Sequence, residues 1–160
     1  MSRYLAIAAV VLLAAAAAAW WGMSRPDPAV SMMAGADIAA GAQLYADNCA
    51  SCHGVNLEGQ PDWRTQDDDG SLPAPPHDET GHTWHHGDGV LFDYTKLGGK
   101  AALARQGIAF NSGMPGFAGK LSDQQIIDVL AYIKSTWPTR QRDVQSARSE
   151  AERLQGETSQ

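Results

Sequence analysis

The chain has 160 residues, which allows one domain with short appendages. Aspartate and glutamate number 18 against 12 lysine and arginine residues, giving a net charge of −6, and the acidic excess lies within residues 35–137. This balance argues against a nucleic-acid-binding protein. It favours docking to a basic patch on a partner, although an acidic surface also simply keeps a protein soluble.

An apolar run without charges occupies residues 4–21 and follows Arg3. As a helix it would span about 27 Å, close to the hydrocarbon core of a bilayer. A cleaved signal peptide would end at small residues such as Ala17, Ala18 and Ala19, whereas an uncleaved anchor would keep Trp20-Trp21 at the far interface. Because the run is long for a signal core, we expect an N-terminal transmembrane helix. Both alternatives for residues 1–22 send the rest of the chain across the membrane.

Residues 23–36 are expected to be a linker, since Pro26 and Pro28 prevent a helix there. Asp37 is then a suitable N-cap for a first helix. One face of this helix would carry Ile38, Gly41, Leu44, Tyr45 and Asn48. A glycine inside a helix is unfavourable, so Gly41 stands out in this segment.

The only two cysteines of the chain stand in the sequence Cys49-Ala50-Ser51-Cys52-His53, the spacing of covalent haem attachment. One helical turn would bring both thiols to the vinyl groups of a haem and place the imidazole of His53 below the iron. A zinc site would need further ligands, and a redox CxxC would need a preceding strand in a βαβ pattern. A disulfide across two residues is uncommon. The stretch therefore predicts one covalently bound haem c.

The segment from residue 54 to residue 93 is rich in glycine and proline and is predicted to be mostly loop. Residues 67–69 are three aspartates, expected to form a solvated turn because the spaced ligands of a calcium loop are missing. His82, His85 and His86 leave three roles open. They are a second metal site, a hydrogen bond from a histidine or Trp84 to a haem propionate, or an exposed polar loop.

A short helix is expected at residues 88–97, ended by the glycine pair 98–99. Its core face would carry Val90, Leu91 and Tyr94.

Met114 is the only methionine that follows the haem motif. A core methionine that fills a gap is the alternative, but the flanking glycines and Pro115 argue against a buried helix face. We therefore predict that the thioether of Met114 is the second axial ligand, so that His53 and Met114 hold the metal together.

A last helix is predicted to begin after Ser122, which with Gln125 forms a capping box. Its apolar face would consist of Ile126, Val129, Leu130 and Ile133, and Pro138 lies just beyond its end. Residues 139–160 are polar and are expected to form a solvated helix or a disordered tail.

These stretches resemble class I monohaem c-type cytochromes, here with the membrane anchor of some bacterial forms. The resemblance spans residues 37–137 and is carried by residues 41–45, 49–54, 114–117 and 121–133. It implies an all-α fold, in which a small helical domain at residues 37–138 wraps around one covalent haem. In that family the last helix crosses the first near the positions of Gly41 and Tyr45.

The resemblance also implies a proline carbonyl that accepts a hydrogen bond from the free ring nitrogen of His53. Pro75 or Pro76 is the candidate and Pro61 the alternative. Family members often have leucine after such prolines, whereas this chain has His77.

The implied function is one-electron transfer on the periplasmic side, between redox protein partners such as a membrane oxidase or dehydrogenase. Since His53 and Met114 would fill both axial positions, we expect an electron carrier and no enzyme. Two alternatives are a haem subunit of a larger membrane redox complex and a haem peroxidase or gas-binding cytochrome in which Met114 is displaced.

Overall fold

The structure is a computed structural model that describes residues 13–16, 20 and 32–158. Within these residues the domain is built from helices and contains no strand, as predicted. The elements are α3 (Ile38–Asn48), α4 (Ala50–His53), the 3₁₀ helix η1 (Thr83–His85), α5 (Asp88–Leu97), α6 (Gly99–Arg105), α7 (Asp123–Thr136) and α8 (Thr139–Thr158).

Most of the predicted anchor, residues 4–21, and most of the linker lie outside the described residues; only residues 13–16 and 20 of the anchor are described. Among the residues that are described, no helix has the length and apolar character needed to cross a bilayer.

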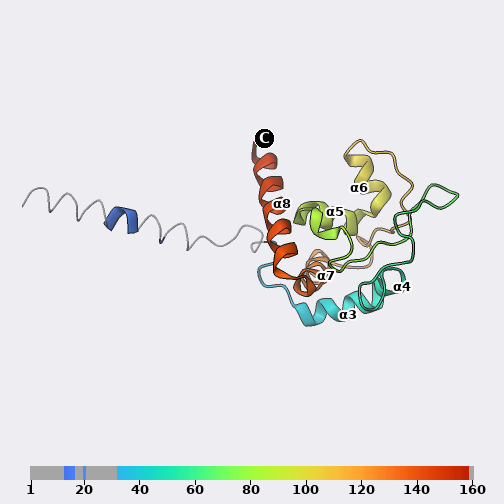
Figure 1. The fold of residues 1–160 in the computed structure, drawn as a ribbon, viewed down its shortest axis with the longest axis horizontal. Helices are drawn as coiled ribbons and strands as arrows, with labels where there is room; N and C mark the ends of the chain where they lie inside the picture. The colour runs from blue at the N-terminus through green and yellow to red at the C-terminus, as the bar shows by residue number, and fades with distance from the viewer. Residues whose placement is uncertain (1–12, 17–19, 21–31, 159–160) are drawn as a thin grey trace, which may run out of the picture.

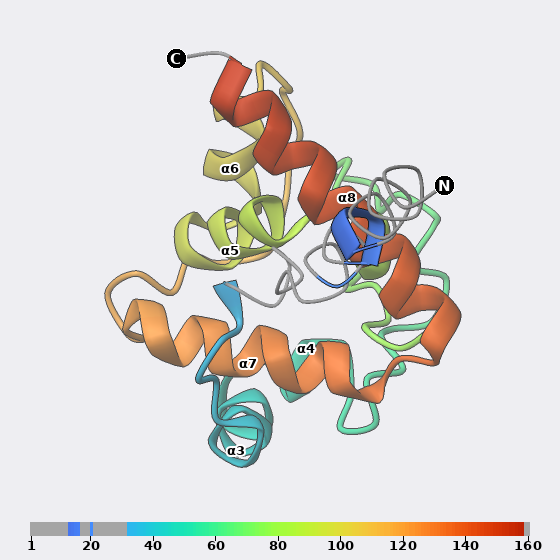
Figure 2. The ribbon, with the colours of Figure 1, turned by 90° about the vertical axis from the view of Figure 1, so that its left-hand side faces the viewer.

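Helix α7 lies at the centre of the domain, with α3 crossing it on one side and α5 on the other (Figures 1 and 2). Its start is fixed as predicted: the Ser122 hydroxyl accepts a hydrogen bond from the Gln125 amide, and the Gln125 side chain accepts one from the Ser122 amide. Each satisfies a backbone donor that the first helical turn would leave unpaired.

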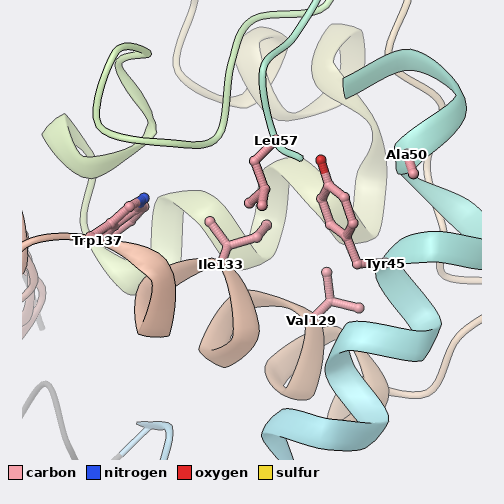
Figure 3. Packing of buried hydrophobic residues seen from close by; sticks show 6 residues of the cluster. All are labelled: Tyr45, Ala50, Leu57, Val129, Ile133 and Trp137. Atoms are coloured by element: carbon pink, nitrogen blue, oxygen red, sulfur yellow. The ribbon is translucent and has the colours of Figure 1, made fainter. Parts of the chain in front are cut away.

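The apolar face of α7 contributes residues to two hydrophobic clusters. Val129 and Ile133 pack with Tyr45, Ala50, Leu57 and Trp137 (Figure 3). Ile126 and Leu130 pack with Leu91, Phe117 and Leu121. All four predicted core residues of α7 are buried, and the helix thereby joins the haem-motif side of the domain to the side that carries Met114.

Helices α3 and α7 approach closely at Gly41. A β-carbon added there would lie 2.5 Å from the carbonyl carbon of Asp128, and closer still to its oxygen. The cap of α3 reinforces the contact, because the Asp37 side chain accepts from the Ala40 amide while the Asp37 amide donates to the Asp128 carboxylate. The expected crossing of the two helices near Gly41 and Tyr45 is confirmed.

Helix α5 has the predicted bounds, and Gly98 ends it with a left-handed φ of +84°. A further helix, α6, begins directly at Gly99 and was not predicted. The glycine pair predicted only the end of α5, because two adjacent glycines do not distinguish a helix end from a sharp turn between two helices.

Residues 139–158 of the C-terminal segment form helix α8, one of the two expected alternatives. Its helix is not fully solvated, however: Gln145 and Ser149 are buried against the start of α5. The Ser149 hydroxyl accepts a hydrogen bond from the Asp88 amide, and the Glu152 carboxylate accepts one from the Gly89 amide. One face of α8 thus caps the start of α5. Because the buried contacts of this face are polar, no apolar periodicity in the sequence predicted them.

The Asp88 carboxylate is the centre of this contact. It is 3% exposed and accepts hydrogen bonds from Lys134 Nζ at 2.7 Å and Gln145 Nε2 at 2.6 Å. We expect Lys134→Met to lower the free energy of unfolding by about 3 kcal/mol, because it leaves a buried carboxylate without its cation. Urea titration followed by helical circular dichroism measures the change.

The control is Lys96→Met, which removes the partner of Asp123 from a pair that is far more exposed. Its expected effect is below about 1 kcal/mol, as for other surface ion pairs. Equal effects of the two variants would contradict a special role for the buried pair.

Candidate haem site

The two cysteines lie on one tight helical turn. Cys49 ends α3 and begins α4, and Cys52 and His53 follow within α4. Both cysteines carry free thiols, Cys52 exposed and Cys49 partly buried. Burial raises the pKa of the Cys49 thiol to about 11, and the negative charge of Cys52 adds to the shift. The turn therefore presents both thiols, which are not joined in a disulfide, beside the imidazole.

His53 is held in the orientation that a metal ligand needs. The residue is 7% exposed, and its Nδ1 lies 2.8 Å from the carbonyl oxygen of Pro75. A carbonyl only accepts hydrogen bonds, so Nδ1 carries the proton and Nε2 keeps its lone pair for a metal. Burial lowers the pKa of His53, while the bond to Pro75 partly opposes that shift. The geometry selects Pro75 over Pro76 and Pro61.

A glycine lets the proline loop reach His53. Gly59 has a φ of +69°, and a β-carbon there would lie 2.7 Å from the carbonyl carbon of Pro75. Its amide donates to the His53 carbonyl at 2.8 Å, and the next amide, that of Gln60, donates to Ala74. The loop is thus hydrogen-bonded on both sides of the close approach.

His77 occupies the position at which the resembled proteins often have leucine. Its ring stacks on His53, with 3.9 Å between centroids and 20° between planes. Burial lowers the pKa of His77 well below its ordinary value, and the nearby His53 and His82 act in the same direction. Sequence reasoning did not assign this residue to the site, although its departure from leucine was the available signal.

Met114 lies in a loop held against the junction of α5 and α6. Its carbonyl accepts from the Gly99 amide at 3.1 Å, and its amide donates to the Ser112 hydroxyl at 3.3 Å. Where the loop meets the end of α5, glycine is needed on both sides: a β-carbon on Gly98 would lie 2.7 Å from the Gly116 nitrogen, and one on Gly116 would lie 2.6 Å from the carbonyl carbon of Leu97. The Met114 side chain is partly buried beside the second cluster. Metal ligation by Met114 stays a prediction.

The loop that carries His82, His85 and His86 shows no sign of a second metal centre. Among the described residues, no three histidine, cysteine, aspartate or glutamate side chains gather as a metal site would require. His82 stacks on Trp63 and His85 packs on Trp84, whose indole N–H donates to the Glu79 carbonyl at 3.3 Å. These rings pack on one another, the Trp84 indole is also hydrogen-bonded to the backbone, and their role toward a propionate stays untested.

The model of the cytochrome c family matches residues 38–137, which include both cysteines, His53 and Met114. The chain belongs to the cytochrome c family. A comparison with curated proteins gives no match. This cytochrome c accordingly binds haem c covalently and serves haem-based electron transfer. Its residues fit the group, because two free thiols and an imidazole with a free Nε2 stand on one turn. Helix α8 lies beyond the matched residues.

Proposed function

We propose that this cytochrome c is a monohaem electron carrier of class I, with His53 and Met114 as axial ligands. The observation that carries the proposal is the hydrogen bond from His53 Nδ1 to Pro75, which leaves Nε2 for the iron. The anchored Met114 loop supports the second ligand, since its backbone is held by Gly99 and Ser112.

When bound, haem c supplies an iron that gains and loses one electron. Cys49 and Cys52 would hold it through thioether bonds, and His53 would offer a neutral nitrogen whose direction Pro75 sets. Met114 would offer a neutral sulfur that favours the reduced state. With His53 and Met114 both held by the chain as ligands, no position on the metal would be left for a substrate, and the protein would act as a carrier.

The purified holoprotein tests this proposal. We expect acid-acetone extraction to leave the haem on the polypeptide, since two thioethers hold it. We also expect ferric and ferrous optical and electron paramagnetic resonance spectra of a low-spin, six-coordinate iron with histidine and thioether ligands. Haem released by the solvent would contradict the attachment, and a high-spin ferric spectrum would contradict the ligand pair.

We propose further that residues 4–21 anchor the protein in a membrane, with the haem domain on the periplasmic side. The support is the uncharged apolar run with Trp20-Trp21 at its end. The acidic domain would then meet basic patches on redox partners such as an oxidase or dehydrogenase. Carbonate-washed membranes should retain the protein with its N-terminal run. A soluble form that begins near Trp20 would instead show a cleaved signal.

A further inference from the structure

His77 is fixed in place by its own backbone. Its amide donates to the Leu57 carbonyl at 2.8 Å, and its carbonyl accepts from the indole N–H of Trp137 at 2.7 Å. Trp137 is 2% exposed and forms part of the first hydrophobic cluster (Figure 3). Both peptide groups that flank the His77 side chain are therefore held, which fixes the direction of the Cα–Cβ bond that carries its ring.

The ring of His77 contacts two other rings. One face stacks on His53 at 3.9 Å, and the ring of Tyr45 meets it nearly edge-on at 5.9 Å and 63°. Tyr45 is itself 1% exposed, and its hydroxyl donates to the Gly54 carbonyl, directly after His53. The three rings therefore form a packed series that ends on the imidazole assigned to the iron.

Histidine is an unfavourable residue for the stability of the fold at position 77. Its Nδ1 is buried and finds no hydrogen-bond partner among the residues that the structure describes. An unpaired buried polar atom costs about 1–3 kcal/mol, a cost that leucine would avoid. Filling the space is therefore not a sufficient reason for His77, whereas a flat ring parallel to His53 offers a contact that leucine does not.

The bond to Pro75 leaves one motion of His53 open. A single hydrogen bond at Nδ1 fixes the tautomer and the direction of that edge, but the ring plane can still rock about the line through Nδ1 and the carbonyl. A second ring stacked within 20° of parallel blocks this rocking. The two contacts together fix the plane of the imidazole.

We propose that His77 is a positioning residue for the axial ligand: by stacking on His53, it sets the rotation of the imidazole plane at the iron. This inference rests on the proposed ligation by His53. It assigns to a residue in the proline loop, 24 positions beyond the ligand, a role in the electronic structure of the metal site.

The test compares ferric holoproteins by proton magnetic resonance, since the pattern of hyperfine-shifted haem methyl signals reports the plane of an axial imidazole. His77→Leu removes the flat ring, and we expect it to change that pattern. His77→Phe keeps a flat ring, and we expect it to retain a pattern close to the wild type. The matched control is Trp63→Leu, which removes an aromatic ring that stacks on His82 and not on His53, and it should leave the methyl signals unchanged.

A wild-type methyl pattern in folded His77→Leu would overturn the proposal, as would equal changes in the Leu and Phe variants. A second measurement needs no variant: the wild-type holoprotein should show nuclear Overhauser contacts between the ring protons of His77 and His53. Their absence would also overturn it. Failure of the proposed function is distinguishable, because wild-type spectra without a histidine-ligated iron would reject the ligand assignment before His77 is considered.

Discussion

Met114→Ala should lower the reduction potential of the holoprotein and open the sixth coordination position. A thioether stabilises the reduced iron, so its loss favours the oxidised state. We expect a drop on the order of a tenth of a volt or more, a fraction of the roughly 0.8 V over which axial ligands set haem potentials. The ferric form should become high-spin, and the ferrous form should bind carbon monoxide. Redox titration and optical spectra measure both effects.

Covalent haem content should survive in this variant, because Cys49 and Cys52 are unchanged. Met114→His is the matched substitution: it should keep the iron six-coordinate and low-spin yet lower the potential, since imidazole donates more strongly to oxidised iron. The ligand assignment would be wrong if Met114→Ala left spectrum and potential nearly unchanged while a substitution at His82, His85 or His86 shifted both. That result would also remove the argument for a simple carrier.

The sequence predicted the haem motif and three helices well because local rules decide them. The Asp37 cap, the capping box of Ser122 and the ending of α5 at Gly98 each depend on residues a few positions apart. The contact of His53 with Pro75 spans 22 residues of loop and was available only through the family resemblance, which left Pro75, Pro76 and Pro61 open.

Two of the missed features depend on contacts between residues that lie far apart in the sequence. Helix α8 docks through Gln145, Ser149 and Glu152 onto the start of α5, about sixty residues earlier in the chain, and leaves no hydrophobic pattern. The stack of His77 on His53 has the same character. A histidine in a proline-rich loop carries no periodic signal, and only the three-dimensional arrangement gives it a partner.

Gly41→Ala should be among the most destabilising single substitutions in the domain. The added β-carbon meets the backbone of Asp128, which cannot turn aside as a flexible side chain does, and it also lies 3.1 Å from Cβ of Tyr132. Helices α3 and α7 would have to move apart, which loosens Tyr45 against Val129 in the first cluster. Overpacking of this kind costs roughly 1–3 kcal/mol and at times more.

Alanine gains about 1 kcal/mol over glycine in helix propensity, so the measured loss is the difference between the two effects. Gly156→Ala isolates the propensity part, because Gly156 also lies in a helix but has open space where its β-carbon would be. We expect that control to be neutral or slightly stabilising, while Gly41→Ala loses about 2 kcal/mol in urea unfolding, the upper end of the overpacking cost less the gain in helix propensity. A Gly41→Ala protein as stable as its Gly156→Ala counterpart would mean that the helices separate at little cost. Since α3 leads directly into the turn of Cys49 and His53, the same separation should lower the yield of covalently attached haem.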